Sequence, residues 1–92
     1  MAVYVDDMYA PFGNMLMCHL WADTHAELIA MVDAIGVQRK WIQYPGTWKE
    51  HFDIAKSKRR LAIAAGAIES EWREYALELH ARQQRPLEEY LR

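Results

Sequence analysis

The sequence has only one cysteine, Cys18, among its 92 residues. A single thiol excludes an intramolecular disulfide and any metal site built from several cysteines. No apolar run approaches the roughly 20 residues that a membrane-spanning helix needs. The first residues have neither a basic start nor a long apolar stretch, so we expect no secretory signal, no membrane partner and a cytoplasmic location.

Basic residues are missing from the first part of the chain. Residues 1–37 contain five acidic residues and no lysine or arginine, whereas residues 38–60 contain seven basic residues and two acidic ones. The formal net charge of −2 therefore conceals a strong segregation of charge. The middle segment can face an anionic ligand, or the two segments can neutralise each other across the fold.

The overall composition is that of a globular protein. Hydrophobic residues make up 52% of the chain and charged residues 26%, which excludes disorder over its whole length. A chain of this size buries somewhat more than ~60% of the surface that it exposes when unfolded, enough for one modest core. We therefore expect a single domain over residues 1–92.

The first third of the chain predicts two strands and a helix. Short apolar runs indicate strands over residues 2–5 and 15–21, with a turn over residues 10–14 between them. Thr24, followed three residues later by a glutamate, has the spacing of a capping box, and Gly36 is placed to end the helix that starts there. The apolar face of this helix consists of Leu28, Met31, Val32 and Ile35.

The next segments are less regular. Residues 37–43 are predicted to form a third short strand, and residues 48–52 a loop. A second helix is expected to start near Asp53 or at Ser57 and to carry Leu61, Ala64, Ala65 and Ile68 inward.

Helical patterns dominate the end of the chain. Residues 69–84 are predicted to form a helix, and Pro86 fits the start of a short terminal helix over residues 87–92. Together the patterns indicate an α+β fold, in which a small sheet of two to three short strands is packed by two helices. This core, residues 1–68, is followed by a helical tail, residues 69–92.

Several stretches of the sequence occur together in one known family. These stretches are MAVYVDDM, APFG, MCHLWADT, AELIAMVDAIG, WIQ and HFDIAKSKRRLAIAAGA. Over about residues 1–68 the chain resembles a family of small bacterial and phage proteins, the domain of unknown function 4031. The resemblance implies no activity, and it raises the option of a phage-borne accessory factor. For the site, it implies that the polar residues in these stretches occur together in the family.

The first candidate site is a run of basic residues at the predicted start of the second helix. If the helix begins at Ser57, its free N–H groups and the neighbouring cations converge where a phosphate binds. Without an anion, these cations would face the positive end of the helix dipole. The residues predicted to contact the phosphate are Ser57, Lys58, Arg59 and Arg60, with His51 and Asp53 orienting it.

The second candidate site combines carboxylates with histidines. The residues are Asp6, Asp7, His19, His51 and Asp53. They can hold a divalent cation or act as general acid and base, with Asp7 and His51 as the catalytic candidates. Because neighbouring strand residues point to opposite faces, at most one of the two adjacent aspartates should enter a shared site, unless the strand has already ended before them. The alternative is structural: helix caps and a hydrogen-bonded core histidine.

Two further features concern ligands and partners. Trp41 and Gln43 lie two residues apart on one face of a predicted strand. With Tyr44 and Trp48 they can form an aromatic platform for a base or a sugar, with the Gln43 amide contacting its edge, or the aromatic side chains can belong to the core. In the tail, an apolar stripe can dock on the first helix, or form a homodimer or partner-docking face. The stripe comprises Trp72, Tyr75, Leu79, Leu87, Tyr90 and Leu91.

Three hypotheses of function follow from these sites. The first is a binding module for a phosphate-bearing ligand, either a nucleotide or a nucleic-acid backbone, through the basic helix start. The second is a small phosphate-chemistry enzyme that uses the aspartates and histidines. The third is a protein-interaction or homodimerising factor. No cofactor is predicted, apart from the option of a divalent metal, and the residues leave open whether the protein is an enzyme.

Overall fold

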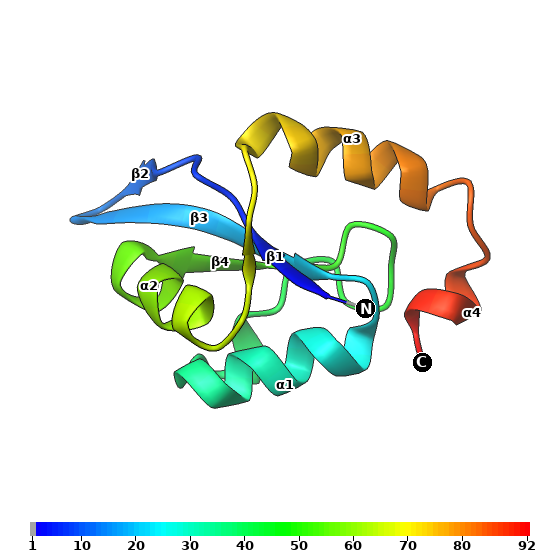
Figure 1. Cartoon of the computed structure of the whole chain (residues 1–92), viewed down its shortest axis with the longest axis horizontal. Coiled ribbons are helices and arrows are strands. Elements are labelled where there is room, and N and C mark those ends of the chain that lie inside the picture. The colour runs from blue at the N-terminus through cyan, green and yellow to red at the C-terminus, as the bar shows by residue number, and fades with distance from the viewer. Residues whose placement is uncertain (1) are drawn as a thin grey trace.

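The computed structural model describes residues 2–92. It contains a sheet of five strands, with helices on both of its faces (Figure 1). The strands are β1 (Val3–Val5), β2 (Ala10–Phe12), β3 (Met15–Ala22), β4 (Phe52–Ala55) and β5 (Ile68–Glu69). The helices are α1 (His25–Ile35), the 3-10 helix η1 (Arg39–Trp41), α2 (Lys56–Ala64), α3 (Trp72–Arg82) and α4 (Leu87–Tyr90).

The long strand β3 organises the sheet. One of its edges pairs antiparallel with both β1 and β2, and the other pairs antiparallel with β4. The short strand β5 adds to β1 in parallel. The α+β fold class is therefore confirmed, but the sheet has five strands rather than the predicted two to three. Strands of two and three residues are too short to show an alternating pattern, which explains why too few strands were predicted from the sequence.

The two faces of the sheet have different partners. Alternate residues of β3 enter the core with α1 and α2, namely Cys18, Leu20 and Ala22. The intervening residues, Met17, His19 and Trp21, belong to the opposite face, where α3 lies (Figure 1). The candidate site residues of β3 and β4 lie on this second face.

The first helix agrees with its prediction in detail. Thr24 is the N-cap of α1, and its side chain accepts a hydrogen bond from the backbone N–H of Glu27. The Thr24 hydroxyl also donates to the Glu27 carboxylate at 2.7 Å. Gly36 ends the helix in the left-handed conformation, at φ 78°, which glycine adopts without steric cost. The strands predicted over residues 2–5 and 15–21 are confirmed as β1 and β3.

The strand predicted over residues 37–43 is wrong. Residues 39–41 form the single turn η1, and Gln43 makes only an isolated bridge to His51. Trp41 and Gln43 therefore do not share the face of a strand. Val37 and Ile42 pack against the core, but they are five residues apart, and Trp41 and Gln43 are exposed, so the segment lacks the alternation of a strand.

The start of the second helix was also predicted incorrectly. Residues 52–55 form β4, in which Phe52 and Ile54 are buried and Asp53 is exposed. The helix begins at Lys56 after Ala55, so neither Asp53 nor Ser57 caps it. The alternation of the strand spans only four residues, and the helical pattern that follows at once conceals it.

Three smaller predictions need correction. Residues 10–12, predicted as part of a turn, form β2, and only the following glycine and asparagine turn the chain. The residues of the second helix that were predicted to point inward, Leu61, Ala64, Ala65 and Ile68, are all exposed, and Ala62 and Ala67 enter the core instead. The helix predicted over residues 69–84 is shorter, because α3 starts at Trp72. The strands β2 and β5 lie at edges of the sheet, where pairing partners rather than periodicity determine the conformation.

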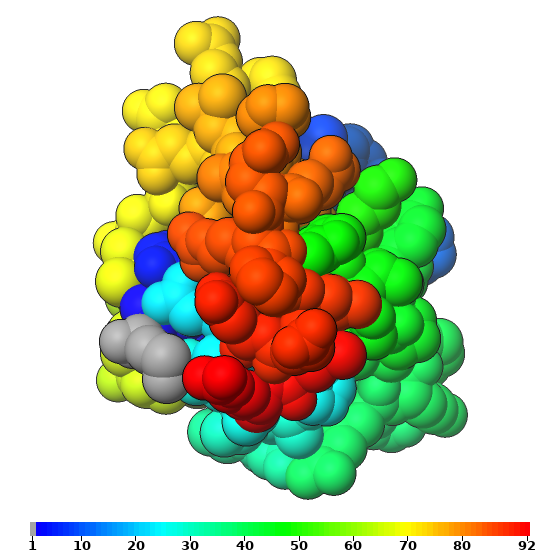
Figure 2. Space-filling model, turned by 90° about the vertical axis from the view of Figure 1, so that its right-hand side faces the viewer, coloured from blue at the N-terminus to red at the C-terminus, as the bar shows by residue number. Residues whose placement is uncertain are grey.

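The tail packs inward through two tyrosines. Tyr75 of α3 is buried against the sheet, and Tyr90 of α4 donates to the fully buried carboxylate of Glu50 at 2.6 Å. Glu50 also bonds to the ring of His25 at the start of α1. Figure 2 shows the orange and red C-terminal residues lying across this side of the molecule, between blue and cyan residues and green ones. Trp72 and Leu91 remain exposed, so the apolar stripe predicted for the tail is buried in part and exposed in part.

Arg82 anchors the end of α3. It is 2% exposed, and its guanidinium bonds to the backbone carbonyl of Ala22 at the end of β3. The guanidinium carbon of Arg82 lies 5.0 Å from the centre of the Tyr90 ring. Among residues 2–92, no helix is both long and apolar enough to cross a membrane.

A candidate metal centre on the sheet

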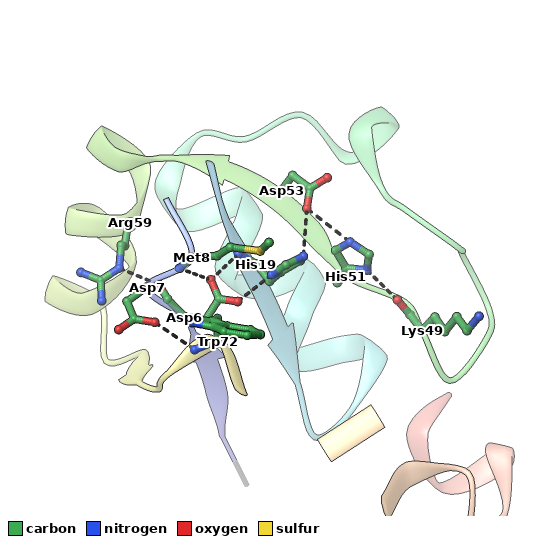
Figure 3. A network of polar contacts seen from close by, with 9 residues as sticks. All are labelled: Asp6, Asp7, Met8, His19, Lys49, His51, Asp53, Arg59 and Trp72. Atoms are coloured by element: carbon green, nitrogen blue, oxygen red, sulfur yellow. Dashed lines mark hydrogen bonds and ion pairs between the residues drawn. The ribbon is translucent and has the colours of Figure 1, made fainter. Parts of the chain in front are cut away.

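Three potential metal ligands meet on the face of the sheet that carries α3. His19 of β3 and Asp53 of β4 are direct cross-strand partners. His51 precedes Asp53 by two residues, and a period of two places both side chains on the same face. The strand register therefore brings the three side chains together from positions up to 34 residues apart (Figure 3).

The three ligand atoms lie within 4.8 Å of one another. Oδ1 of Asp53 is 3.3 Å from Nε2 of His51 and 3.9 Å from Nε2 of His19. A tetrahedral zinc ion with bonds of about 2.0–2.2 Å separates its ligand atoms by roughly 3.3–3.6 Å. The two distances to Asp53 are therefore close to the spacing of a zinc site, and all three ligand atoms lie within 4.8 Å of one another.

Both histidines present the same ring nitrogen to the cluster. Nδ1 of His51 is 2.7 Å from the backbone oxygen of Lys49, and a carbonyl can only accept a hydrogen bond. Nδ1 of His19 is 2.6 Å from Oδ2 of Asp6. With Nδ1 as the donor in both rings, Nε2 is the nitrogen that faces Asp53. It donates to the carboxylate when the ring is protonated, and it offers its lone pair to a metal ion when the ring is neutral.

Asp6 is the positioning residue for His19. It is fully buried, and Oδ1 accepts hydrogen bonds from the backbone N–H groups of His19, at 2.8 Å, and Met8, at 3.2 Å. Its own backbone oxygen accepts from Nε of Arg59 at 2.8 Å. These contacts hold Asp6 in one orientation, and Asp6 in turn holds the imidazole ring.

The charges in the cluster stabilise one another. Burial lowers the pKa of His19, but the hydrogen bond to Asp6 and the charges of Asp6 and Asp53 outweigh it and raise this pKa above its ordinary value. The contact with His51 holds the pKa of Asp53 below its ordinary value, against the opposing effect of burial. An ionised carboxylate among imidazole nitrogens is a donor set that suits zinc and other divalent transition metals.

One side of the cluster is covered and the other is open. The ring of Tyr75 stacks on that of His19, with centroids 4.3 Å apart, and burial raises the pKa of this tyrosine so that it stays neutral. Asp53, by contrast, is 42% exposed. His19 and Asp53 line a groove of about 690 Å³, which lies on the open side. The groove gives solvent and ligands access to the cluster.

The other predicted catalytic residue, Asp7, is not part of the cluster. Oδ1 of Asp7 accepts a hydrogen bond from the backbone N–H of Trp72 at 2.9 Å (Figure 3). It therefore caps the first turn of α3, where a negative charge is favourable. Both aspartates follow the end of β1 at Val5, so the alternation of a strand does not separate them. Asp6 orients His19 of the cluster, whereas Asp7 contacts α3.

Replacing Asp7 with alanine is expected to destabilise the fold and to leave the cluster intact. Loss of a helix cap costs about 0.5–2 kcal/mol in free energy of unfolding. Urea unfolding measures this loss, and a zinc titration of the same variant should match that of the unmodified chain. A variant with normal stability but impaired zinc binding would contradict the assignment of Asp7 as a cap.

The basic residues predicted to bind phosphate do not converge. Nζ of Lys58 donates to the backbone oxygen of Ile35 at the end of α1, 3.0 Å away. Besides its bond to Asp6, Arg59 pairs with the carboxylate of Glu69 at 3.3 Å. Ser57 and Arg60 lie exposed within α2, whose start has no side-chain cap. Two of the four predicted phosphate contacts thus hold the fold together, because buried carbonyl groups of other elements accept their hydrogen bonds.

Trp41 and Gln43, by contrast, do lie near the cluster. Both line the same groove as His19 and Asp53, although they reach it from η1 and the isolated bridge rather than from a strand. Their ligand-binding role remains a prediction. Sequence reasoning missed Tyr75 as a neighbour of the cluster, because nothing in the pattern of α3 indicates which face of the sheet it covers.

Fold and site together define a small α+β protein with a His–His–Asp cluster on an open sheet face. The family is shown by comparison of the sequence with family profiles. Residues 3–82 match the family described as protein of unknown function DUF4031, and the chain belongs to it. The match confirms the resemblance seen in the sequence and extends beyond residue 68 to include α3. No curated protein and no solved structure matched the chain.

Proposed function

We propose that this protein is a metal-dependent enzyme that hydrolyses phosphate esters at the cluster of His19, His51 and Asp53. The observation that carries the proposal is the convergence of the three ligand atoms within 4.8 Å, with the opposite nitrogen of each ring already hydrogen-bonded. Three protein ligands leave positions for water and substrate, which is typical of catalytic rather than structural zinc sites.

The cluster has the charge and orientation that such chemistry requires. A divalent cation supplies a Lewis acid that polarises a phosphoryl oxygen and lowers the pKa of water to about 7. In the hydrolysis, a water oxygen bonds to phosphorus, the bond from phosphorus to the leaving oxygen breaks, and that oxygen takes up a proton. Two neutral imidazoles and one carboxylate leave the loaded cluster with a net positive charge toward an anionic substrate.

Positive charge beside the groove favours a phosphate-bearing ligand. Nζ of Lys40 lies 5.0 Å from the centre of the Trp41 ring, which lines the groove. Lys40 thus differs from Lys58 and Arg59, whose donors are used within the fold. The phosphate predicted for the start of α2 is therefore better accommodated at the metal cluster. Pairing of two copies through the tail stays a separate prediction, since Tyr75 and Tyr90 pack inward.

A metal titration tests the proposal. The chain is first stripped with a chelator and then unfolded thermally with Zn²⁺, Mn²⁺ or Co²⁺. A metal at 100 times its Kd adds about 2.7 kcal/mol to the free energy of unfolding. Each kcal/mol raises the Tm of a domain of this size by about 4–8 °C. We expect such a rise at one metal per chain, together with metal-dependent cleavage of a chromogenic phosphodiester.

Two results would contradict this proposal. If no divalent metal raises the Tm or binds at one per chain, the cluster is a structural hydrogen-bond network. If a metal binds but no phosphate ester is cleaved faster than in a metal-matched solution without protein, the site binds metal without the proposed chemistry. A carboxylic ester serves as the comparison substrate, because it tests whether the preference is for phosphate.

A further inference from the structure

The groove beside the metal cluster has a composition that is unusual for an exposed surface. Apart from His19, Asp53 and Gln43, its lining is apolar. The apolar side chains include Met8, Phe12, Met15, Met17, Val37 and Trp41. Four of these remain strongly exposed, with Trp41 at 58% and Phe12 at 68%. At about 690 Å³ the groove is within the usual size of a small-molecule site.

We propose that this groove binds the base of a nucleotide whose phosphate lies at the metal cluster. The inference rests on the proposed function, because the cluster supplies the site for the phosphate. Nζ of Lys40 lies over one face of the Trp41 indole, and a base that stacks on this ring takes the other face or displaces the Lys40 side chain. The methionine side chains are flexible and polarisable, so they adapt to the flat faces of a ring.

Gln43 is placed to contact the edge of the base. Its backbone N–H donates to the carbonyl of His51 at 2.8 Å, and its own carbonyl accepts from His51 at 3.2 Å. These two bonds tie Gln43 to the residue that supplies one metal ligand, two positions before Asp53. A side-chain amide carries both donors and an acceptor, which match the edges of a nucleobase. The isolated β-bridge thus joins the residue that contacts the base, Gln43, to a residue that holds the metal, His51.

The charges and the shape favour a nucleotide over other ligands with an apolar part. A purely apolar ligand would displace water from the imidazole and carboxylate groups at the end of the groove and offer no hydrogen bond in its place, which is unfavourable. Lys40 beside the Trp41 ring adds a positive charge that suits an anion. A nucleotide supplies a flat ring, polar edges and a phosphate in a single ligand. The same chemistry is present in a free mononucleotide and at the end of a nucleic-acid strand.

Calorimetry on the zinc-loaded chain tests this inference. The probes are adenosine, guanosine and uridine monophosphates, and ribose 5-phosphate as the matched ligand without a base. We expect at least one nucleotide to bind more tightly than ribose 5-phosphate. Trp41→Ala should weaken that nucleotide by about 5- to 150-fold, the range for loss of one base–aromatic stack. The zinc affinity of Trp41→Ala should stay unchanged, because Trp41 lies outside the three ligands.

Trp72→Ala is the control, since Trp72 is similarly exposed but does not line the groove. Gln43→Ala serves as a second variant and is expected to change the preference among the bases. Tighter binding of a short single strand with a terminal phosphate than of the mononucleotide would identify a strand end as the source.

The outcomes separate this inference from the proposed function. Equal affinity for the nucleotides and ribose 5-phosphate, or no effect of Trp41→Ala, would overturn the base site and leave zinc-dependent hydrolysis standing. Failure of the unmodified chain to bind zinc would overturn the proposed function itself. The zinc titration is therefore carried out first, on the same protein preparations.

Discussion

Replacing Asp53 with asparagine is expected to lower the affinity for zinc by more than ~100-fold. Loss of a partner that only orients a metal ligand costs about 10–100-fold, and removal of the anionic ligand itself should cost more. An amide is also a weaker ligand for zinc than an ionised carboxylate. Competition against a chromophoric chelator measures the change, and metal-dependent phosphodiester cleavage should fall with it.

The fold should survive this substitution, because Asp53 is partly exposed and asparagine has nearly the same volume. Asp33→Asn is the matched control: Asp33 is an exposed aspartate that pairs with Arg39 at 2.6 Å, on the C-terminal half of α1. Asp33→Asn should bind zinc as the unmodified chain does. If Asp53→Asn keeps its zinc affinity to within a few-fold, the metal centre is not where we place it.

A graded result is expected for Asp6, which orients His19 without touching the metal. Asp6→Asn should weaken zinc binding by the ~10–100-fold typical of such partners, less than Asp53→Asn does. The unfolding transition of the variant must be recorded as well, because Asp6 is fully buried. An effect as large as that of Asp53→Asn would mean that Asp6 is itself a ligand.

The largest loss of stability is expected for Phe52→Ala. Phe52 is fully buried in β4, and truncation of a buried phenylalanine costs about 3–5 kcal/mol in free energy of unfolding. Phe12→Ala removes the same atoms from an exposed residue of β2 and should cost little. Urea unfolding of both variants gives the comparison.

This pair of variants also tests the strand that the sequence did not reveal. Residues 48–50 form the loop that their pattern predicts, but Phe52 begins β4. If Phe52 also lay in an exposed loop, it would contribute no more than Phe12 to the free energy of unfolding. A small effect of Phe52→Ala would therefore contradict the assignment of β4, and with it the strand register that places Asp53 beside His19. A large effect supports both the strand and the site that it carries.

Local signals explain which elements could be predicted. The helix that begins after Thr24 is specified within its own residues by a capping box, an apolar stripe and a terminal glycine. The strands β1 and β3 are marked by apolar runs. β4 and β5 have four and two residues, and their conformation depends on the strands beside them. Pairing of this kind is a non-local interaction, which a local pattern does not contain.

The candidate site shows the same division. His19, His51 and Asp53 of the cluster, and Asp6 beside it, can be selected from the sequence because their side chains bind metals or protons. That these side chains lie together could not be predicted, because it depends on the pairing of His19 with Asp53 across β3 and β4. Likewise, a run of cations predicts an anion site, but Lys58 and Arg59 instead satisfy carbonyl groups brought to them from α1 and from the end of β1.

By itself, the sequence determined the fold class, the family and the boundaries of α1. These properties depend on residues that are neighbours along the chain, so their physical causes are local. Only the tertiary structure decided that Asp6 orients His19, that Asp7 caps α3 and that two histidines meet Asp53 beside an apolar groove. Each of these depends on strand register and on the packing of α3, and both are set by contacts between distant parts of the chain.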